Sequence, residues 1–359
     1  PGMKRIAALA LVFILLLTMA ATSAAAGIPA GDGQYNLLLL GIDTRDPENW
    51  DGCRTDTIII ATILENENKI KFTSLMRDTY LPIPGMGYGR INAAYAVGGA
   101  ELTVKTIQDN FGVTVDDYVV FDFDFVRNLT DTLGGITVKM NASEARVMNR
   151  AYPDAHFAVG KNELNGDQTL TYCRIHKGCG NDFERTRRQR DVLKILFSKI
   201  PMIGQDGLLK LTSERYASVV TSIDALDFVH WGVLLYQMRG AKFADLRIPV
   251  DGAYRNRVIK GMDILLPDMA KNLKALRRFL DLKAETPSPT PTLKKGSAGE
   301  AVRSLQDKLI ESGFLFGIPT GVYDQTTVDA VKKFQRANGI SVDGVAGPET
   351  LGYLFGTWL

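Results

Sequence analysis

Three apolar runs near the start of the chain have the length and composition of buried β-strands. They cover Tyr35–Leu40, Thr57–Leu64 and Ile70–Leu75, and the first contains four consecutive leucines. Continuous apolar runs of this length are typical of strands that are covered on both faces. Consecutive strands are usually neighbours in a sheet, so we predict that these three form an antiparallel meander.

Helical periodicity dominates later parts of the chain. One predicted helix begins at about Asp182 and continues through Leu196. Apolar residues recur at helical spacing over 301–312 and again over 328–334, and a Gly-Val pair followed by a threonine occurs twice, at 321–327 and 344–350. The C-terminal residues therefore predict a small all-α domain of three helices with two similar turns.

The first residues, 1–27, have the pattern of an export signal. Lys4 and Arg5 precede an uncharged apolar stretch, and Ala24 and Ala26 fit a small-x-small cleavage site. The alternative is a membrane anchor, because the uncharged stretch 6–26 is long enough to span a bilayer. Both interpretations place the rest of the chain outside the cytoplasmic membrane.

A composition change marks a second boundary. Residues 284–292 are rich in Pro, Ser and Thr and read as an extended linker. The linker separates a predicted body, 34–283, from the helical tail, 293–359. The 45% apolar content is that of an ordinary globular protein.

Charge and cysteine content exclude several classes of protein. The chain has 42 Lys and Arg against 40 Asp and Glu, and 42 − 40 = +2, which argues against a dedicated nucleic-acid-binding protein. The 3 cysteines are too few for a disulfide scaffold and are wrongly spaced for a zinc ribbon. Any charge-dependent function must therefore depend on local clusters.

One such cluster follows from the predicted meander. In an antiparallel meander, the end of the first strand and the end of the third strand both lie beside the start of the second. The residues that this topology collects at one edge of the sheet are Asp43, Arg54, Asp56, Arg77 and Asp78.

A second cluster lies at the predicted helix near residue 182. Its basic residues are Arg174, His176, Lys177, Arg185, Arg187, Arg188 and Arg190. Arg185 and Arg188 are three residues apart and share a helix face. We assign Arg174, Arg185 and Arg188 to ligand binding. For Arg187 and Arg190 we prefer a solvated helix face, on which Arg187 pairs with Asp191.

These residue types suit phosphate chemistry. Two carboxylates, Asp43 and Asp56, would repel each other without a cation, and oxygen ligands favour Mg²⁺ or Mn²⁺. Guanidinium groups bind phosphate oxygens through two parallel hydrogen bonds. No GxxxxGK[ST] motif of a P-loop NTPase occurs, and an exported enzyme has no ATP supply. The expected substrate is therefore a lipid-linked pyrophosphate.

The tail resembles the peptidoglycan-binding domain type 1 family. The resemblance rests on GSAGEAVRSLQDKL and on GVYDQTTVDAVKKFQRANGISVDGVAGPETLGYL. It implies a non-catalytic module that docks on the bacterial cell wall.

The body resembles the LytR-CpsA-Psr family from about Gln34 to Leu282. The matching segments are NLLLLGIDTRD, CRTDTIIIATI, SLMRDTYLPIPG, GRINAAYAVGGAEL, YVVFDFDFVRNLTDTLGGITV, LNGDQTLTYCRIH and DFERTRRQRDVL. The resemblance implies an α/β fold, a central mixed sheet flanked by helices, with an apolar tunnel for a polyprenyl tail. It also implies Mg²⁺-dependent transfer of an anionic glycopolymer, such as teichoic acid, from a polyprenyl pyrophosphate lipid to peptidoglycan.

Carried over by position, the resemblance assigns roles to ten residues. Asp43 and Asp56 would bind the metal, and Asp78 would orient Arg77 or act near the metal. The expected pyrophosphate-binding residues are Arg54, Arg77, Arg90, Arg174, Arg185, Arg188 and Gln189. Two positions depart from the family pattern: Arg90 stands where Lys is usual, and His176 where Arg is usual. The loss of a fixed charge at His176 weakens the expectation for pyrophosphate binding.

The expected reaction is attack of a glycan hydroxyl on the phosphorus that carries the polymer, with Asp43, Asp56, Arg77 and Asp78 as the catalytic set. The base that takes the hydroxyl proton stays open. Two alternatives also stay open: a polyprenyl pyrophosphate hydrolase, and a non-catalytic wall-binding or regulatory protein. The expected location is the cell wall or the outer face of the cytoplasmic membrane, which the protein would contact through its lipid substrate and, as an anchor, through its N-terminus.

The cysteines leave a further choice. Outside the cell, Cys179 could pair with Cys53 or with Cys173 and brace the site, or all three could be isolated thiols.

Overall fold

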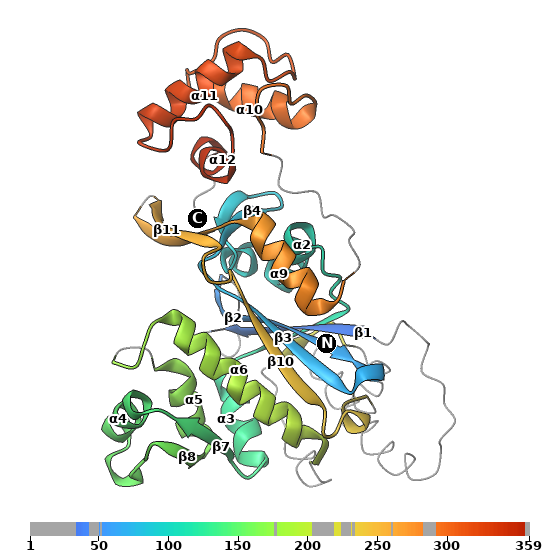
Figure 1. Cartoon of the computed structure of the whole chain (residues 1–359), viewed down its shortest axis with the longest axis vertical. Helices are drawn as coiled ribbons and strands as arrows, with labels where there is room; N and C mark the ends of the chain where they lie inside the picture. The colour runs from blue at the N-terminus through green and yellow to red at the C-terminus, as the bar shows by residue number, and fades with distance from the viewer. Residues whose placement is uncertain are drawn as a thin grey trace. The chain divides into compact units, whose positions relative to one another are not determined.

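The computed structural model describes residues 34–42, 50, 52–175, 178–202, 219–223, 231, 234–259, 261–282 and 292–355. The chain forms two compact units (Figure 1), one of Pro1–Met76 with Val115–Ile248, the other of Arg77–Thr114 with Pro249–Leu359. The N-terminal segment 1–27 and the linker up to residue 291 lie outside the described residues. Within the described residues, no helix is both long and apolar enough to span a bilayer.

A six-stranded mixed sheet is the centre of the first unit, in the order β10-β3-β2-β1-β6-β9. Its strands are β1 (Gln34–Ile42), β2 (Thr55–Leu64), β3 (Lys69–Leu75), β6 (Asp117–Phe121), β9 (Val219–Thr221) and β10 (Lys242–Ile248). β1, β2 and β3 are antiparallel neighbours, which confirms the predicted meander, whereas β6 joins β1 and β10 joins β3 in parallel. Residues 37–40 of β1 are buried in succession, as expected for a strand covered on both faces.

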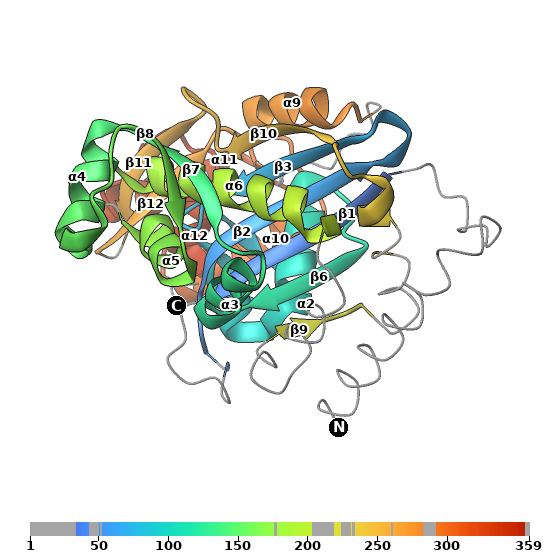
Figure 2. The same cartoon turned by 90° about the horizontal axis from the view of Figure 1, so that it is seen from below.

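Helix α6 (Asp182–Lys199) lies across one face of this sheet (Figure 2). Phe197 of α6 packs edge-on against Phe72 of β3, with ring centroids 5.3 Å apart. The same apolar cluster contains Ile59 of β2 and Trp231. The predicted helix from about Asp182 is therefore confirmed, and its apolar residues belong to the core.

Arg190 of α6 is buried against the sheet, so the prediction of a solvated side chain was wrong. Its Nε donates to Asp245 of β10 at 3.0 Å, and its Nη1 donates to Ser74 of β3 at 3.2 Å. Lys194, one turn further, also binds Asp245. Burial alone would raise the pKa of Asp245, but the hydrogen bond from Lys194 and the charge of Arg190 hold it below its usual value.

A small α/β layer completes the first unit. It consists of α3 (Phe123–Thr132), β7 (Ile136–Met140), α4 (Ala142–Ala151), β8 (Gly160–Leu164) and α5 (Gly166–Arg174). β7 and β8 form an antiparallel hairpin, and apolar residues of the layer pack against Val192 and Leu196 of α6. Gly166 starts α5 where a Cβ would lie 2.3 Å from the carbonyl oxygen of Arg127, so a side chain has no room there.

The body part of the second unit contains two hairpins and two helices. These are β4 (Tyr80–Ile83) with β5 (Gly87–Arg90), β11 (Tyr254–Ile259) with β12 (Met262–Pro267), α2 (Ala93–Phe111) and α9 (Met269–Leu280). The described residues also contain the 3-10 helices η1 (Glu65–Glu67), η2 (Pro153–Ala155) and η3 (Ile200–Met202).

The tail in the second unit is helical, as expected. It contains α10 (Glu300–Glu311), α11 (Gln325–Ala337) and α12 (Pro348–Phe355). Val328, Val331 and Phe334 share the buried face of α11.

The two Gly-Val turns of the tail are held by equivalent buried glutamines. The Nε2 of Gln306 donates to the carbonyl of Val322 and to the hydroxyl of Thr327, while its Oε1 accepts from the amide of Gly321. Gln335 repeats these three contacts at the second turn, with Val345, Thr350 and Gly344. The sequence repeat is therefore a repeat of one hydrogen-bonded turn.

Replacing Asp245 with Asn should destabilise the first unit by about 1–3 kcal/mol, because it leaves Arg190 buried without its counter-charge. The folded-state pKa of Asp245 lies below its unfolded value, so its contribution is complete above about pH 5 and is lost as the pH falls through the folded pKa. Urea unfolding of D245N and the parent chain at neutral and at acidic pH measures both effects. Asp109→Asn, at an exposed pair with Lys105, is the control and should change little. An equal stability difference at both pH values would contradict the assignment.

Replacing either Gln306 or Gln335 with Ala should destabilise the tail by about 2 kcal/mol, since buried turn amides and hydroxyls lose their partners. In the full chain this corresponds to an approximately 30-fold loss of amide exchange protection in α11. Gln325→Ala, whose side chain is exposed, serves as the control. Unchanged protection in Q306A and Q335A would show that the glutamines do not hold the turns.

Candidate active site

A β-bulge places Asp56 at the start of β2. Gly41 of β1 pairs with Thr57, but the next residue, Ile42, pairs with Thr55, so Asp56 is the extra residue between them. A bulge bends the strand and redirects the side chain that it carries. The side chain of Asp56 is 24% exposed, whereas Thr55 is fully buried. The expected metal partner, Asp43, lies outside the described residues.

Arg185 meets Asp56 from the first turn of α6. Its Nη1 lies 3.9 Å from Asp56, and its Nη2 lies 2.8 Å from Asp182 in the same turn. Asn181 caps the helix by accepting from the amides of Phe183 and Glu184. The structure therefore joins a residue of the strand cluster to a residue of the helix cluster, at the positively polarised end of a long helix.

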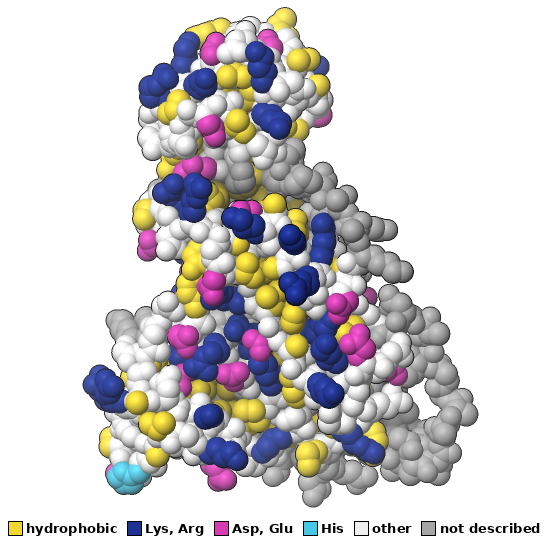
Figure 3. All heavy atoms as spheres, in the orientation of Figure 1, with side chains coloured by type: hydrophobic (Ala, Val, Ile, Leu, Met, Phe, Trp, Pro, Cys, Tyr) yellow, Lys and Arg dark blue, Asp and Glu magenta, His cyan; other side chains and the backbone are white. Residues whose placement is uncertain are grey.

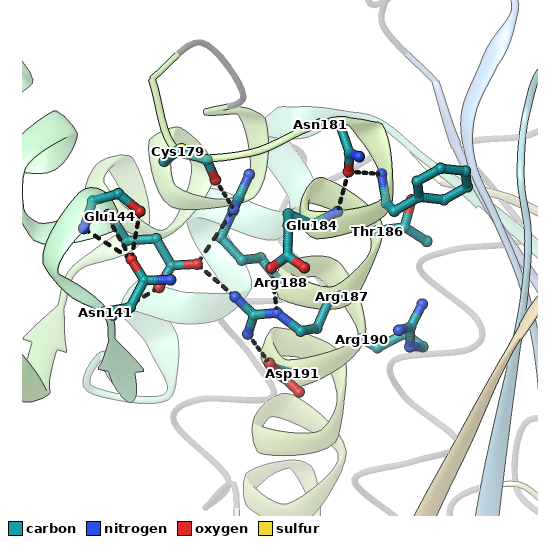
Figure 4. Close-up of polar contacts among 12 residues, drawn as sticks. Asn141, Glu144, Cys179, Asn181, Glu184, Thr186, Arg187, Arg188, Arg190 and Asp191 are labelled. Atoms are coloured by element: carbon teal, nitrogen blue, oxygen red, sulfur yellow. Dashed lines mark hydrogen bonds and ion pairs between the residues drawn. The ribbon is translucent and has the colours of Figure 1, made fainter. Parts of the chain in front are cut away.

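Arg188 has a different place from the one expected (Figure 4). It is fully buried, and its guanidinium binds Glu144 and the carbonyls of Tyr172, Ile175 and Cys179. Four of its five N–H groups are thus used within the protein. The structure does not present Arg188 to a ligand. The prediction failed because sequence spacing shows that Arg188 shares a face with Arg185 but not which parts of the chain cover that face.

Arg187 pairs with Asp191 at 2.9 Å, as expected. It also binds Glu184 at 2.8 Å and Glu144 at 2.6 Å. Burial alone would lower the pKa of Arg187, but these acidic partners raise it above its usual value. Arg187 therefore stays charged and belongs to a network rather than to an isolated surface pair.

The other predicted residues of the first unit are more accessible. Arg54 is exposed just before β2, and Gln189 is half-buried on α6. Arg174, the last residue of α5, is exposed, and its guanidinium lies 4.3 Å from the ring centre of Phe123. His176 lies outside the described residues.

The second unit holds a separate group of predicted residues. Asp78 lies between two arginines, with Oδ2 3.7 Å from Nε of Arg77 and Oδ1 3.1 Å from Nη1 of Arg90. Arg90 ends strand β5 and pairs in register with Tyr80. This geometry provides the contact through which Asp78 was expected to orient Arg77.

The donor chemistry of Asp56 suits a hard divalent cation. Its carboxylate is only partly buried, which leaves access for the water molecules that Mg²⁺ retains. Across the described residues, which do not include Asp43, no three His, Cys, Asp or Glu side chains are grouped to hold a metal ion.

All three cysteines, each within a described segment, are free thiols. The disulfide alternatives are thus not present in the structure. Burial raises the pKa of the Cys173 thiol to about 12 and also raises that of Cys179, and the nearby Arg188 only partly offsets this. Both shifts favour the protonated thiol over the nucleophilic thiolate.

Sequence reasoning missed three residues of this region. Asp182 binds Arg185, Glu144 binds two arginines, and the guanidinium of Arg247 lies 4.2 Å from the ring centre of Phe183. Asn141 and Glu144 form a capping box, whose spacing was visible in the sequence as a helix start. That signal locates α4 but does not reveal that Glu144 faces α6.

The fold and the charged residues of the site together indicate which kind of ligand the protein suits. A mixed sheet flanked by helices carries, at one strand end, a partly exposed carboxylate beside a buried arginine, and a helical domain follows. On the face drawn in Figure 3, basic and acidic side chains are interspersed. The arginine groups in each unit suit a compact anion such as a phosphate better than an extended polyanion.

The chain belongs to the LytR_cpsA_psr family, whose sequence pattern matches residues 18–278. A second pattern, that of a putative peptidoglycan binding domain, matches residues 298–354. Both family resemblances predicted from the sequence are confirmed.

Named relatives and a solved structure agree with this membership. The chain is 34% identical to the polyisoprenyl-teichoic acid–peptidoglycan teichoic acid transferase TagU of Enterococcus faecalis over 53% of this chain and 59% of TagU. It is 30% identical to the regulatory protein MsrR of Staphylococcus aureus over 70% of this chain and 75% of MsrR. The family protein YwtF (TagT) with bound octaprenyl pyrophosphate lipid has the same fold, with a TM-score of 0.54 and 20% identity over 72% of this chain and 95% of YwtF. The predicted α/β fold is confirmed.

Proposed function

We propose that this protein transfers an anionic glycopolymer from a polyprenyl pyrophosphate lipid to peptidoglycan during cell-wall assembly. The contact between Asp56 and Arg185 carries this proposal, because it joins the two sequence clusters at the edge of the sheet. TagU is named as such a transferase, and YwtF was solved with a polyprenyl pyrophosphate.

In the proposed reaction, a glycan hydroxyl of peptidoglycan, the C6 hydroxyl of N-acetylmuramic acid, attacks the phosphorus that bears the polymer. A new P–O bond forms, and the P–O bond to the lipid phosphate breaks and leaves its electron pair on that phosphate. Arg185 would stabilise the charge that develops on the phosphate oxygens, and the family resemblance gives the same role to Arg77. The hydroxyl proton would pass to a carboxylate, for which the resemblance offers Asp78 or a metal ligand.

We infer that the carboxylates of Asp56 and Asp43 hold Mg²⁺ or Mn²⁺. When bound, such an ion neutralises charge on the pyrophosphate. Arg185, which already pairs with Asp56, would then face the substrate from α6.

The tail fits the transferase better than the hydrolase alternative. A wall-binding domain tethered to the enzyme raises the effective concentration of the acceptor glycan, which a hydrolase using water does not need. We place the protein outside the cytoplasmic membrane, where its lipid substrate and the wall meet.

Replacing Arg185 or Arg77 with Ala should lower polymer transfer by about 10²–10³-fold, because each change removes a charged donor from the transition state. Transfer of labelled polymer from its lipid carrier to purified peptidoglycan measures the effect. Arg150→Ala, at an exposed arginine of α4, is the control and should retain transfer. Full transfer by R185A would refute the proposed site. Release of lipid phosphate without attachment to peptidoglycan would indicate the hydrolase.

Removing divalent ions with a chelator should abolish transfer, and Mg²⁺ or Mn²⁺ should restore it. Asp56→Asn should need at least about tenfold more Mg²⁺ for half-maximal activity, since an amide is a weaker ligand than a carboxylate. Binding of the same chain to peptidoglycan should be unaffected by the chelator, which controls for general damage. Transfer that persists without divalent ions would rule out the metal site.

A further inference from the structure

We propose that Glu144 is a positioning residue for the pyrophosphate site. Its buried carboxylate holds Arg188 inside the protein, and Arg188 in turn ties the end of α5, which carries Arg174, to the start of α6, which carries Arg185. This inference rests on the proposed function, in which Arg174 and Arg185 bind the substrate.

The charges of Glu144 and Arg188 are buried almost completely. The exposed fraction of the side chain is 1% for Glu144 and 0% for Arg188, and Oε1 of Glu144 lies 3.3 Å from Nη1 of Arg188. An arginine cannot lose its proton in a protein, so its burial requires a counter-charge and acceptors for its N–H groups. Glu144 is the acid that binds this guanidinium.

The remaining hydrogen bonds of Arg188 act on the connection between α5 and α6. Its Nε donates to the carbonyl of Tyr172 at 3.1 Å, its Nη2 donates to that of Ile175, and its Nη1 reaches that of Cys179 at 3.5 Å. These carbonyls belong to the last turn of α5, the residue that caps it, and the approach to α6. One side chain of α6 therefore clamps both ends of the connection.

Glu144 is itself held in place at the start of α4. Its Oε2 accepts from the amide of Asn141 at 3.0 Å, and the side chain of Asn141 accepts in return from the amide of Glu144. This reciprocal cap fixes the carboxylate before it meets the arginines. The contact thus has the rigidity that a positioning residue needs.

The clamp sets the geometry of the ligand-binding arginines. Arg174 is the last residue of α5, two residues after Tyr172, and Arg185 lies one turn before Arg188 on α6. Fixing the two helix ends fixes the backbone positions from which Arg174 and Arg185 extend, and phosphate recognition depends on where such side chains start. Without Glu144, the charge of Arg188 would be drawn towards water and the three carbonyls would lose their common donor.

The test uses variants of the full chain and two measurements. Glu144→Gln should weaken binding of a polyprenyl pyrophosphate at least tenfold. It should also speed exchange at least tenfold at the amides of Ile175 and Arg185, which donate to Thr171 and Asn181 at the two helix ends. Glu144→Asp, which keeps the charge, should recover part of both. Arg187→Gln is the matched control: it also removes a contact to Glu144 but leaves the carbonyl clamp, so binding and exchange should stay near those of the parent chain.

A double variant tests whether Glu144 positions the helix ends through Arg188 or only neutralises the buried charge of Arg188. Glu144→Gln with Arg188→Met removes both buried charges, so the fold should be at least as stable as that of E144Q, yet binding should remain weak because no side chain holds the carbonyls. If the double variant regains parental binding, Glu144 only neutralises a buried charge and the proposal fails. Parental binding and exchange in E144Q would overturn it directly.

The same design distinguishes this failure from failure of the proposed function. If R185A binds the lipid pyrophosphate as tightly as the parent chain, the pyrophosphate site itself is wrong. Exchange at the amides of Ile175 and Arg185 reports on the clamp independently of any ligand. If amide exchange is faster in E144Q while R185A binds the lipid pyrophosphate as tightly as the parent chain, the clamp stabilises the fold but has no role in a pyrophosphate site.

Discussion

The buried arginines of α6 impose the constraint on which the first unit depends. Arg185, Arg188 and Arg190 lie in fewer than two turns and are all buried, and none can shed its charge. Each must therefore meet an acid. Arg188 meets Glu144 at the start of α4 and Arg190 meets Asp245 in β10, while Arg185 binds Asp182 in its own turn and also approaches Asp56 at the bulge of β2.

These three pairings orient α6 in a way that apolar packing alone would not. Hydrophobic contacts such as that of Phe197 with Phe72 tolerate small rotations and shifts of a helix, because dispersion is not directional. The buried pairs of Arg188 with Glu144 and of Arg190 with Asp245 are also hydrogen-bonded and do not tolerate them, since a displaced charge is left without its partner. The helix is consequently locked to the sheet on one side and to the small α/β layer on the other, with its N-terminal turn beside Asp56.

The strands, α6 and the repeated turn of the tail could be predicted because each depends on local pattern. The meander also brought Asp56 to the correct strand end, although the bulge that exposes it leaves no trace in the apolar pattern. The roles of Arg188 and Arg190 could not be predicted in this way. Helical spacing shows which residues share a face, but their partners, Glu144 and Asp245, are 44 and 55 residues distant in sequence. Which face of α6 is buried depends on tertiary contacts: β10 pairs in parallel with β3, and the start of α4 lies against α6.

This distinction limits what a family motif can assign to a side chain. The family motif around α6 assigns the same role to Arg185 and Arg188, yet their guanidinium groups have different surroundings in the fold. Arg185 stands at a strand end beside a partly exposed carboxylate, where a phosphate could exchange with its acidic partners. Arg188 donates four hydrogen bonds, one to Glu144 and three to backbone carbonyls, and has no exposed surface. A lysine in its place would keep the charge but could not reach several carbonyls in one plane. The position of Arg188 therefore requires the shape of the guanidinium hydrogen-bonding fork as much as its charge, and the acceptors around a buried arginine show that it supports the fold.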